Sequence, residues 1–273
     1  MQQDERPYHG IPAQRQALVA AGFVPLPLFG KTPPVYGKNG AKKGLGGWQN
    51  LEDVSSEQIA DWSRHWPDAS NTGVLTKHAP ALDLDILNEE AARACEDLVR
   101  ERFEGRGAVL VRIGRPPKRA ILFRTEVPFS KILGPVTAPN GGADPEKIEF
   151  LGAGQQLACF GIHPDTAQPY RWHGGEPGQI RRDDLPLITA DEARALVADL
   201  VELLARDFGY TRPKRGKKKG DNGTLNEGGG SDWADLFDNI HAGQSLHDSL
   251  CAMAARLIKS GTSPGAAVNQ LRR

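Results

Sequence analysis

The segment "ALDLDIL", residues 81–87, constrains the fold more than any other part of the chain. Two aspartates alternate with apolar residues in what otherwise reads as a buried strand. Side chains at positions i and i+2 of a strand point to one face, so Asp83 and Asp85 are neighbours and the apolar residues fill the opposite face. Because desolvating an unpaired carboxylate is costly, a core accepts two only at a solvated strand end or beside positive charge. Two interpretations stay open: the wet face of an edge strand, or oxygen ligands for a divalent cation.

Composition limits the class of protein. The 273 residues suffice for one large domain or two modest ones. The 34 basic and 34 acidic side chains cancel, so any affinity for nucleic acid must come from local patches. Three distant cysteines without a CxxC pair argue against a disulfide framework and against a zinc site built on cysteine pairs. Without a signal-peptide pattern or a long apolar run, we expect a cytoplasmic protein.

Apolar periodicity and turn residues predict a mixed α/β (α+β) fold. Helical spacing and capping residues predict helices at residues 13–22, 55–66, 89–103 and 190–208. Strands are expected at residues 23–29, 72–76, 81–87, 107–114, 119–125, 146–152 and 156–163. Prolines make the first of these an edge strand. The other six are expected to pair in sequence order, as three hairpins.

Changes in composition predict the domain boundaries. Residues 30–49 are too rich in glycine and proline for regular structure, and such long loops are usually functional or disordered. Residues 211–231 combine a basic run with several glycines, which is typical of a linker. We therefore expect a folded domain at residues 1–210, a linker at 211–231 and a helical segment at 232–273.

Three further stretches carry candidate functional residues. "VRIGRPPKRAILF", residues 111–123, places basic side chains around a turn that can present cations to phosphate oxygens. Glu149 stands between two apolar residues of a strand, and His163 directly follows a strand. Trp48 is the one exposed-looking aromatic candidate for stacking on a nucleic-acid base. Structural interpretations stay open for each: a solvated basic turn, an exposed strand position, a structural histidine and a core tryptophan.

The ordered set of motifs resembles a known family. "GFVPLPLFGK", "KGLGGWQ", "SSEQIADWSRHWPDASNTGVLT", "LDLDI", "RIGRPPKRAILFRT", "KIEFLG" and "GIHPDTAQPYRW" are similar to the bifunctional DNA primase/polymerase (prim-pol) family of the archaeo-eukaryotic primase superfamily. The resemblance covers roughly residues 10–210. It implies an archaeo-eukaryotic primase-type core with an RRM-like catalytic sheet at residues 1–210. It also implies that residues 232–273 begin a primase C-terminal helical module.

The resemblance also implies an activity and its residues. Members are metal-dependent nucleotidyltransferases that act as DNA primase or DNA polymerase, widely in phages, plasmids and mobile elements. Asp83 and Asp85 match the first acidic motif and Glu149 the third, and together they would hold two Mg²⁺ or Mn²⁺ ions. The histidine of the second motif is missing from "GRPPKRA", which leaves Lys118 as the nearest substitute. The other residues that we expect to contact the nucleotide are Arg112, Arg115 and His163.

The implied partners are a single-stranded DNA template, dNTP or NTP, and a helicase domain or protein. Phosphates of the template would meet Lys31, Lys38, Lys42 and Lys43 and the basic run at 212–219, with Trp48 available for stacking. Three alternatives remain: a binding module that serves a downstream helicase without synthesis, a metal-dependent nuclease, and, more distantly, a DxD glycosyltransferase.

Overall fold

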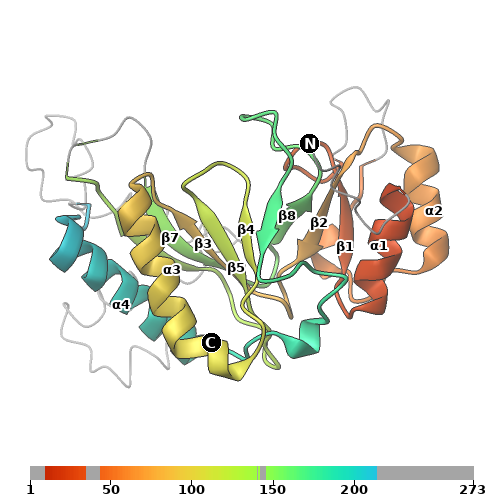
Figure 1. The fold of residues 1–273 in the computed structure, drawn as a ribbon. Coiled ribbons are helices and arrows are strands. Elements are labelled where there is room, and N and C mark those ends of the chain that lie inside the picture. Colours follow the sequence, from red (N-terminus) through yellow and green to blue (C-terminus); the bar gives the residue numbers. More distant parts are fainter. Residues whose placement is uncertain (1–9, 35–43, 140, 142–145, 214–273) are drawn as a thin grey trace, which may run out of the picture. The chain divides into compact units, whose positions relative to one another are not determined.

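The computed structural model describes residues 10–34, 44–139, 141 and 146–213, which form a mixed α+β fold (Figure 1). This part of the chain holds four α-helices and two antiparallel sheets. None of its helices has both the length and the hydrophobicity needed to cross a membrane. The helical segment predicted at 232–273, most of the linker predicted at 211–231, and Lys38, Lys42 and Lys43 lie outside the described residues.

The smaller sheet has three strands in the order β1-β2-β8, all antiparallel. Its bounds are β1 (Pro25–Leu28), β2 (Asn71–Leu75) and β8 (Gln156–Phe160). Helices α1 (Ile11–Ala20) and α2 (Ser56–His65) lie beside it (Figure 1). As its prolines predict, β1 is an edge strand. A capping box between Ser55 and Gln58 starts α2, in agreement with the predicted helix start.

The larger sheet has six strands in the order β6-β7-β3-β5-β4-β9. Its bounds are β3 (Ala81–Asp85), β4 (Val111–Ile113), β5 (Arg119–Leu122), β6 (Ile132–Val136), β7 (Glu146–Leu151) and β9 (Arg171–His173). Helices α3 (Glu89–Phe103) and α4 (Ala190–Phe208) cover one face, where they bury the apolar side chains of β3 and β7. Short 3₁₀ turns lie at Trp48–Asn50, Glu104–Arg106 and Arg182–Asp184.

Two of the three predicted hairpins are wrong. β4 and β5 pair as expected, but β2 pairs with β8, and β3 pairs with β7. The segments predicted at 72–76 and 81–87 thus belong to different sheets, as do those at 146–152 and 156–163. The alternation of apolar and polar residues identifies a strand and its buried face, but it does not identify the strand with which it pairs. The four strands form one antiparallel ribbon that passes from one sheet into the other.

The ribbon bends where its two segments pass from one sheet to the other, at residues 76–80 and 152–155. Buried Thr76 ties the two crossings together, since its N–H donates to Gln155 O (3.1 Å) and its hydroxyl donates to Gly152 O (2.7 Å). A Cβ on Gly152 would stand 2.1 Å from the carbonyl oxygen of Phe129, so only glycine fits there. The bend is therefore defined by local contacts that larger side chains would disrupt.

We expect Thr76→Val to lower the free energy of unfolding by about 0.5–1.5 kcal/mol, because it removes one of the two hydrogen bonds that the buried Gly152 carbonyl accepts while the side-chain volume hardly changes. Chemical denaturation followed by circular dichroism measures the loss. The matched control is Thr137→Val at an exposed position, where less than about 0.5 kcal/mol is expected. Equal losses at the two positions would contradict the role given to Thr76.

Candidate active site

Three carboxylates converge on the face of the larger sheet that α3 and α4 do not cover. Asp83 lies directly opposite Glu149 in the β3–β7 register, and Asp85 is two residues further along the same face. Oxygen atoms of all three carboxylates lie within 4.8 Å of one another. Because β3 runs between β7 and β5, the edge-strand interpretation of the two aspartates is wrong. The pairing of β3 with β7 brings together acids that are distant in the sequence.

Four cationic side chains balance these acids. Arg112 lies 3.8 Å from Asp83, and Lys118 lies 3.3 Å from Asp85. Two further lysines hold Glu149: the ammonium of Lys131 is 2.5 Å from one carboxylate oxygen and that of Lys147 is 2.8 Å from the other. Lys147 also approaches Asp85, at 3.9 Å. These ion pairs offset the cost of placing three carboxylates on one half-buried surface.

Two of these cations were missed from the sequence. Lys147 stands two residues before Glu149 on β7, so the i, i+2 rule that grouped the aspartates could have found it. Lys131 precedes β6, a strand that the sequence did not predict because glycine and proline interrupt its apolar pattern.

Burial and charge change the acidity of the site in opposite directions. Burial is the main cause that raises the pKa of Asp83 to about 6; Arg112 opposes this shift, and the neighbouring carboxylates add to it. Burial also acts on Glu149, but the bonds from Lys131 and Lys147 outweigh it and hold the pKa of Glu149 below its usual value. Both groups are therefore mainly ionised at pH 7, as oxygen ligands for a cation must be.

A pocket of about 250 Å³ lies beside the carboxylates and receives side chains from both sheets. Its described lining contains all four residues predicted to contact a nucleotide, together with Lys31: Lys31, Arg112, Arg115, Lys118 and His163. Two buried lining atoms, Arg112 Nε and Gln156 Oε1, have no hydrogen-bond partner in the described part of the protein. Because such atoms are rare in folded proteins, they point to a polar ligand.

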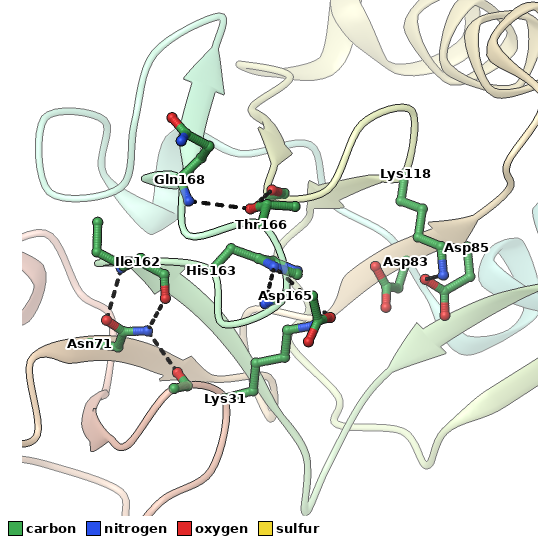
Figure 2. Close-up of polar contacts among 12 residues, drawn as sticks. Lys31, Asn71, Asp83, Asp85, Lys118, Ile162, His163, Asp165, Thr166 and Gln168 are labelled. Atoms are coloured by element: carbon green, nitrogen blue, oxygen red, sulfur yellow. Dashed lines mark hydrogen bonds and ion pairs between the residues drawn. The ribbon is translucent and has the colours of Figure 1, made fainter. Parts of the chain in front are cut away.

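The basic hairpin divides its side chains between two surfaces. Arg112 is fixed toward the pocket, since Nη1 donates to Ala158 O (2.7 Å) and the guanidinium lies 5.1 Å from the ring centre of Tyr170. Lys118 reaches Asp85 from the end of the hairpin (Figure 2). Arg119 turns instead to α3, where it pairs with Glu89 and Glu96. The interpretation of this segment as a fully solvated basic turn is therefore wrong.

His163 enters the pocket from the loop that follows β8 and packs against the start of the hairpin, since a Cβ on Gly114 would lie 2.7 Å from its ring. Its Nδ1 accepts a hydrogen bond from the N–H of Asp165 (3.2 Å), so the neutral ring carries its proton on Nε2. Burial, followed by the nearby charge of Lys31, lowers the pKa of His163. Lys31 reaches the same loop through an ion pair with Asp165 at 3.3 Å (Figure 2). Two groups from loops of the smaller sheet therefore line the pocket beside the acids: the ammonium of Lys31 and the Nε2–H donor of His163.

One buried amide fixes both loops that carry these groups. Asn71, 2% exposed at the start of β2, donates to Gly30 O (2.8 Å) and Ile162 O (2.7 Å) and accepts from Ile162 N–H (2.9 Å) (Figure 2). The carbonyls adjoin Lys31 and His163 in sequence. Gly161, at φ +104°, leaves room for the Asn71 amide, because a Cβ at residue 161 would lie 2.0 Å from Asn71 Oδ1. No pattern in the sequence had singled out Asn71.

The candidates for nucleic-acid contact have different positions. Trp48 is half-buried and packs against the apolar cluster of the smaller sheet that contains Leu26, Leu28 and Tyr170. Lys31 lines the pocket, and Lys42 and Lys43 lie outside the described residues. The geometry therefore gives Lys31 a place beside the acids and gives Trp48 a packing role.

Comparison with known proteins agrees with the sequence resemblance. Residues 15–187 match the family described as "Bifunctional DNA primase/polymerase, N-terminal". The search of curated proteins finds no match. The matched region contains both sheets, the three carboxylates and the pocket, and its α+β architecture is the one that the resemblance implies. Because the match spans more than half of the chain, this protein belongs to the bifunctional DNA primase/polymerase family.

Proposed function

We propose that this chain catalyses template-directed nucleotidyl transfer, as a DNA primase, a DNA polymerase or both, at the site formed by Asp83, Asp85 and Glu149. Membership of the family supports DNA and nucleotide substrates. The observation that carries the proposal is the convergence of three carboxylates beside a pocket lined by cations. A polyanionic triphosphate fits that pocket, because its charge would meet several positive groups.

The three carboxylates fit hard divalent cations, since each offers oxygen ligands and their oxygens lie within 4.8 Å of one another. Two Mg²⁺ or Mn²⁺ ions are the proposed cofactors. Such ions, when bound, supply Lewis-acid activation of an acceptor hydroxyl and neutralise charge on the phosphates.

The chain's own residues position the reactants. Lys31, Lys118 and His163 would donate to the triphosphate, and Arg112 and Arg115 would add positive charge along it. The acceptor 3′-hydroxyl oxygen forms a bond to the α-phosphorus of the nucleotide as the bond to the bridging oxygen breaks. Pyrophosphate leaves with that electron pair, and the hydroxyl proton passes to solvent. No protein nucleophile is required.

Further parts of the proposal rest on the sequence. These are the single-stranded template, a helicase partner, replication of a phage, plasmid or mobile element, and a cytoplasmic location. The division into a catalytic domain at 1–210, a linker at 211–231 and a helical segment at 232–273 also stays a prediction, as does template contact by Lys42, Lys43 and Trp48.

A test of the acids uses Asp83→Asn, Asp85→Asn and Glu149→Gln, which remove charge with little change of volume. Primer extension with Mg²⁺ or Mn²⁺ should fall on the order of 100-fold or more, because charge stabilisation in the transition state is lost. Binding of Mn²⁺, followed by electron paramagnetic resonance, should weaken in parallel.

The matched control is Glu126→Gln at an exposed carboxylate, which should leave synthesis and Mn²⁺ binding unchanged. Undiminished synthesis by the three variants would reject the assignment of the acids. Binding of DNA without nucleotide incorporation by the wild type would favour the binding module. Loss of DNA in the absence of nucleotides would favour the nuclease.

A second test concerns Asn71 as a positioning residue. Asn71→Ser removes the bridge between the loops of Lys31 and His163, so we expect the Kd for dNTP to rise about tenfold. Gly161→Ala should have the same effect, because its Cβ would displace the amide. Equilibrium binding of dNTP provides the measurement.

The control for stability is Tyr210→Phe, which removes a buried hydrogen bond to Glu146 (2.9 Å) on the opposite face of the larger sheet. This variant should lose stability and keep the wild-type Kd. If Asn71→Ser and Tyr210→Phe change the Kd equally, Asn71 has only a structural role.

A further inference from the structure

The hairpin that joins β4 and β5 is anchored on the face of the larger sheet opposite the three carboxylates. Arg119, the first residue of β5, lies directly opposite Leu84 in the β3–β5 register, on the face that α3 and α4 cover. Its side chain is only 8% exposed. Because burying a charged group is costly, the contacts of this guanidinium must compensate for the lost hydration.

Every nitrogen of the guanidinium donates to an acceptor. Nε donates to Pro117 O (3.2 Å), Nη2 donates to a carboxylate oxygen of Glu89 (2.9 Å), and Nη1 donates to Glu96. Both glutamates are on α3, whereas Pro117 is in the turn of the hairpin. One side chain thus ties the turn to the helix, through the planar set of donors that arginine has and lysine lacks.

The two segments that Arg119 joins carry Asp85 and Lys118. Glu89 follows Asp85 by four residues, where the chain passes from β3 into α3. Pro117, which accepts from Nε, directly precedes Lys118. One step further along the β3–β5 register, Asp85 and Lys118 meet on the catalytic face, at 3.3 Å (Figure 2). The same two segments are therefore connected on both faces of the sheet.

A nucleotide would affect these two connections differently. In the proposed function, Lys118 turns from Asp85 to a phosphate oxygen as a cation occupies the carboxylate. The ammonium then reaches the phosphate only from the position of its own backbone, in the turn of the hairpin. The connection on the other face stays intact, because neither Arg119 nor its two glutamates line the pocket in the described part of the protein.

We infer that Arg119 is a positioning residue for Lys118. It holds the turn of the hairpin against α3 and so fixes the place from which Lys118 meets the triphosphate. The inference rests on the proposed function and deepens it, because it gives a share of nucleotide affinity to a residue on the far face of the sheet that contacts no substrate.

A double-mutant cycle tests whether Arg119 acts through Lys118. Arg119→Gln alone should raise the Kd for dNTP about fivefold, because the turn is no longer held in place. In a chain that already carries Lys118→Met, the same substitution should change the Kd by less than about twofold, since the residue on which it acts is gone. Equilibrium binding of dNTP to the four proteins provides the measurement.

The matched control is Arg100→Gln. Arg100 also donates to Glu96 (2.8 Å), but its other partner, Glu104, lies just after the end of α3, so these contacts do not reach the hairpin. This variant should lose stability in chemical denaturation, as Arg119→Gln does, and should keep the wild-type Kd. A Kd that rises equally in the two variants would reduce Arg119 to a structural role.

The reactivity of Lys118 in the protein without nucleotide provides a second measurement. An ammonium held in an ion pair is not nucleophilic, so release of the turn should raise the rate at which N-hydroxysuccinimide acetate acetylates Lys118 about threefold in Arg119→Gln. Lys147, on β7, should keep its rate. Mass spectrometry of peptides measures both rates. Glu89→Gln, at a more exposed carboxylate, replaces Arg119→Gln if that variant does not fold, and should act in the same direction.

The two measurements separate failure of the inference from failure of the proposed function. If the wild type binds dNTP but incorporates none, nucleotidyl transfer is wrong and the cycle still decides the role of Arg119. If the wild type binds no dNTP, the proposed function is wrong and the acetylation rate decides. The inference is overturned by an equal rise in the Kd with and without Lys118, or by an acetylation rate of Lys118 that neither Arg119→Gln nor Glu89→Gln changes.

Discussion

The bent ribbon formed by β2–β3 and β7–β8 is the constraint on which the site depends. Its strands pair twice, β2 with β8 in one sheet and β3 with β7 in the other, and both chains cross between the sheets at the bend tied by Thr76. The strand register of each sheet is therefore fixed relative to the same bend. The carboxylates lie toward the far end of one paired arm, and the loop that carries His163 leaves the far end of the other. Their meeting across the pocket follows from pairing and not from proximity in the sequence.

Electrostatics then determines what this arrangement can hold. Carboxylates on an interior strand are tolerable only if cations compensate the lost hydration, and here the cations come from several different strands and loops. The protein thus presents its acids already oriented and already paired with cations. In the proposed function, a divalent cation would compete with these ammonium groups for the carboxylates, and the ammonium groups would then pair with phosphate oxygens. Such an exchange would link binding at the acids to binding of nucleotides.

The sequence predicts local features well and pairing poorly. The helices at 89–103 and 190–208 agree with α3 and α4 residue for residue, because caps and periodicity act within a few turns. The shared face of Asp83 and Asp85 follows from strand geometry alone. Contacts across the sheet determine which strands pair, where β6 and β9 form and where Lys131 lies, and one-dimensional spacing does not contain those contacts. Asn71 escaped notice for the same reason, since its three bonds reach residues far along the chain.

In the proposed function, the acids and the phosphate contacts come from different kinds of element, which would explain why the second-motif histidine can be absent. A cation site requires ligand oxygens that are held in position to within a fraction of an ångström, and interior strands in fixed register provide this. A phosphate oxygen requires only a donor or a positive charge within reach, and flexible or loop-borne groups can supply it. Ala120 is the residue opposite Asp83 on β5, so the strand offers no donor beside the acids. Lys118 from the hairpin and His163 from the loop after β8 line the pocket from outside the strands that hold the acids.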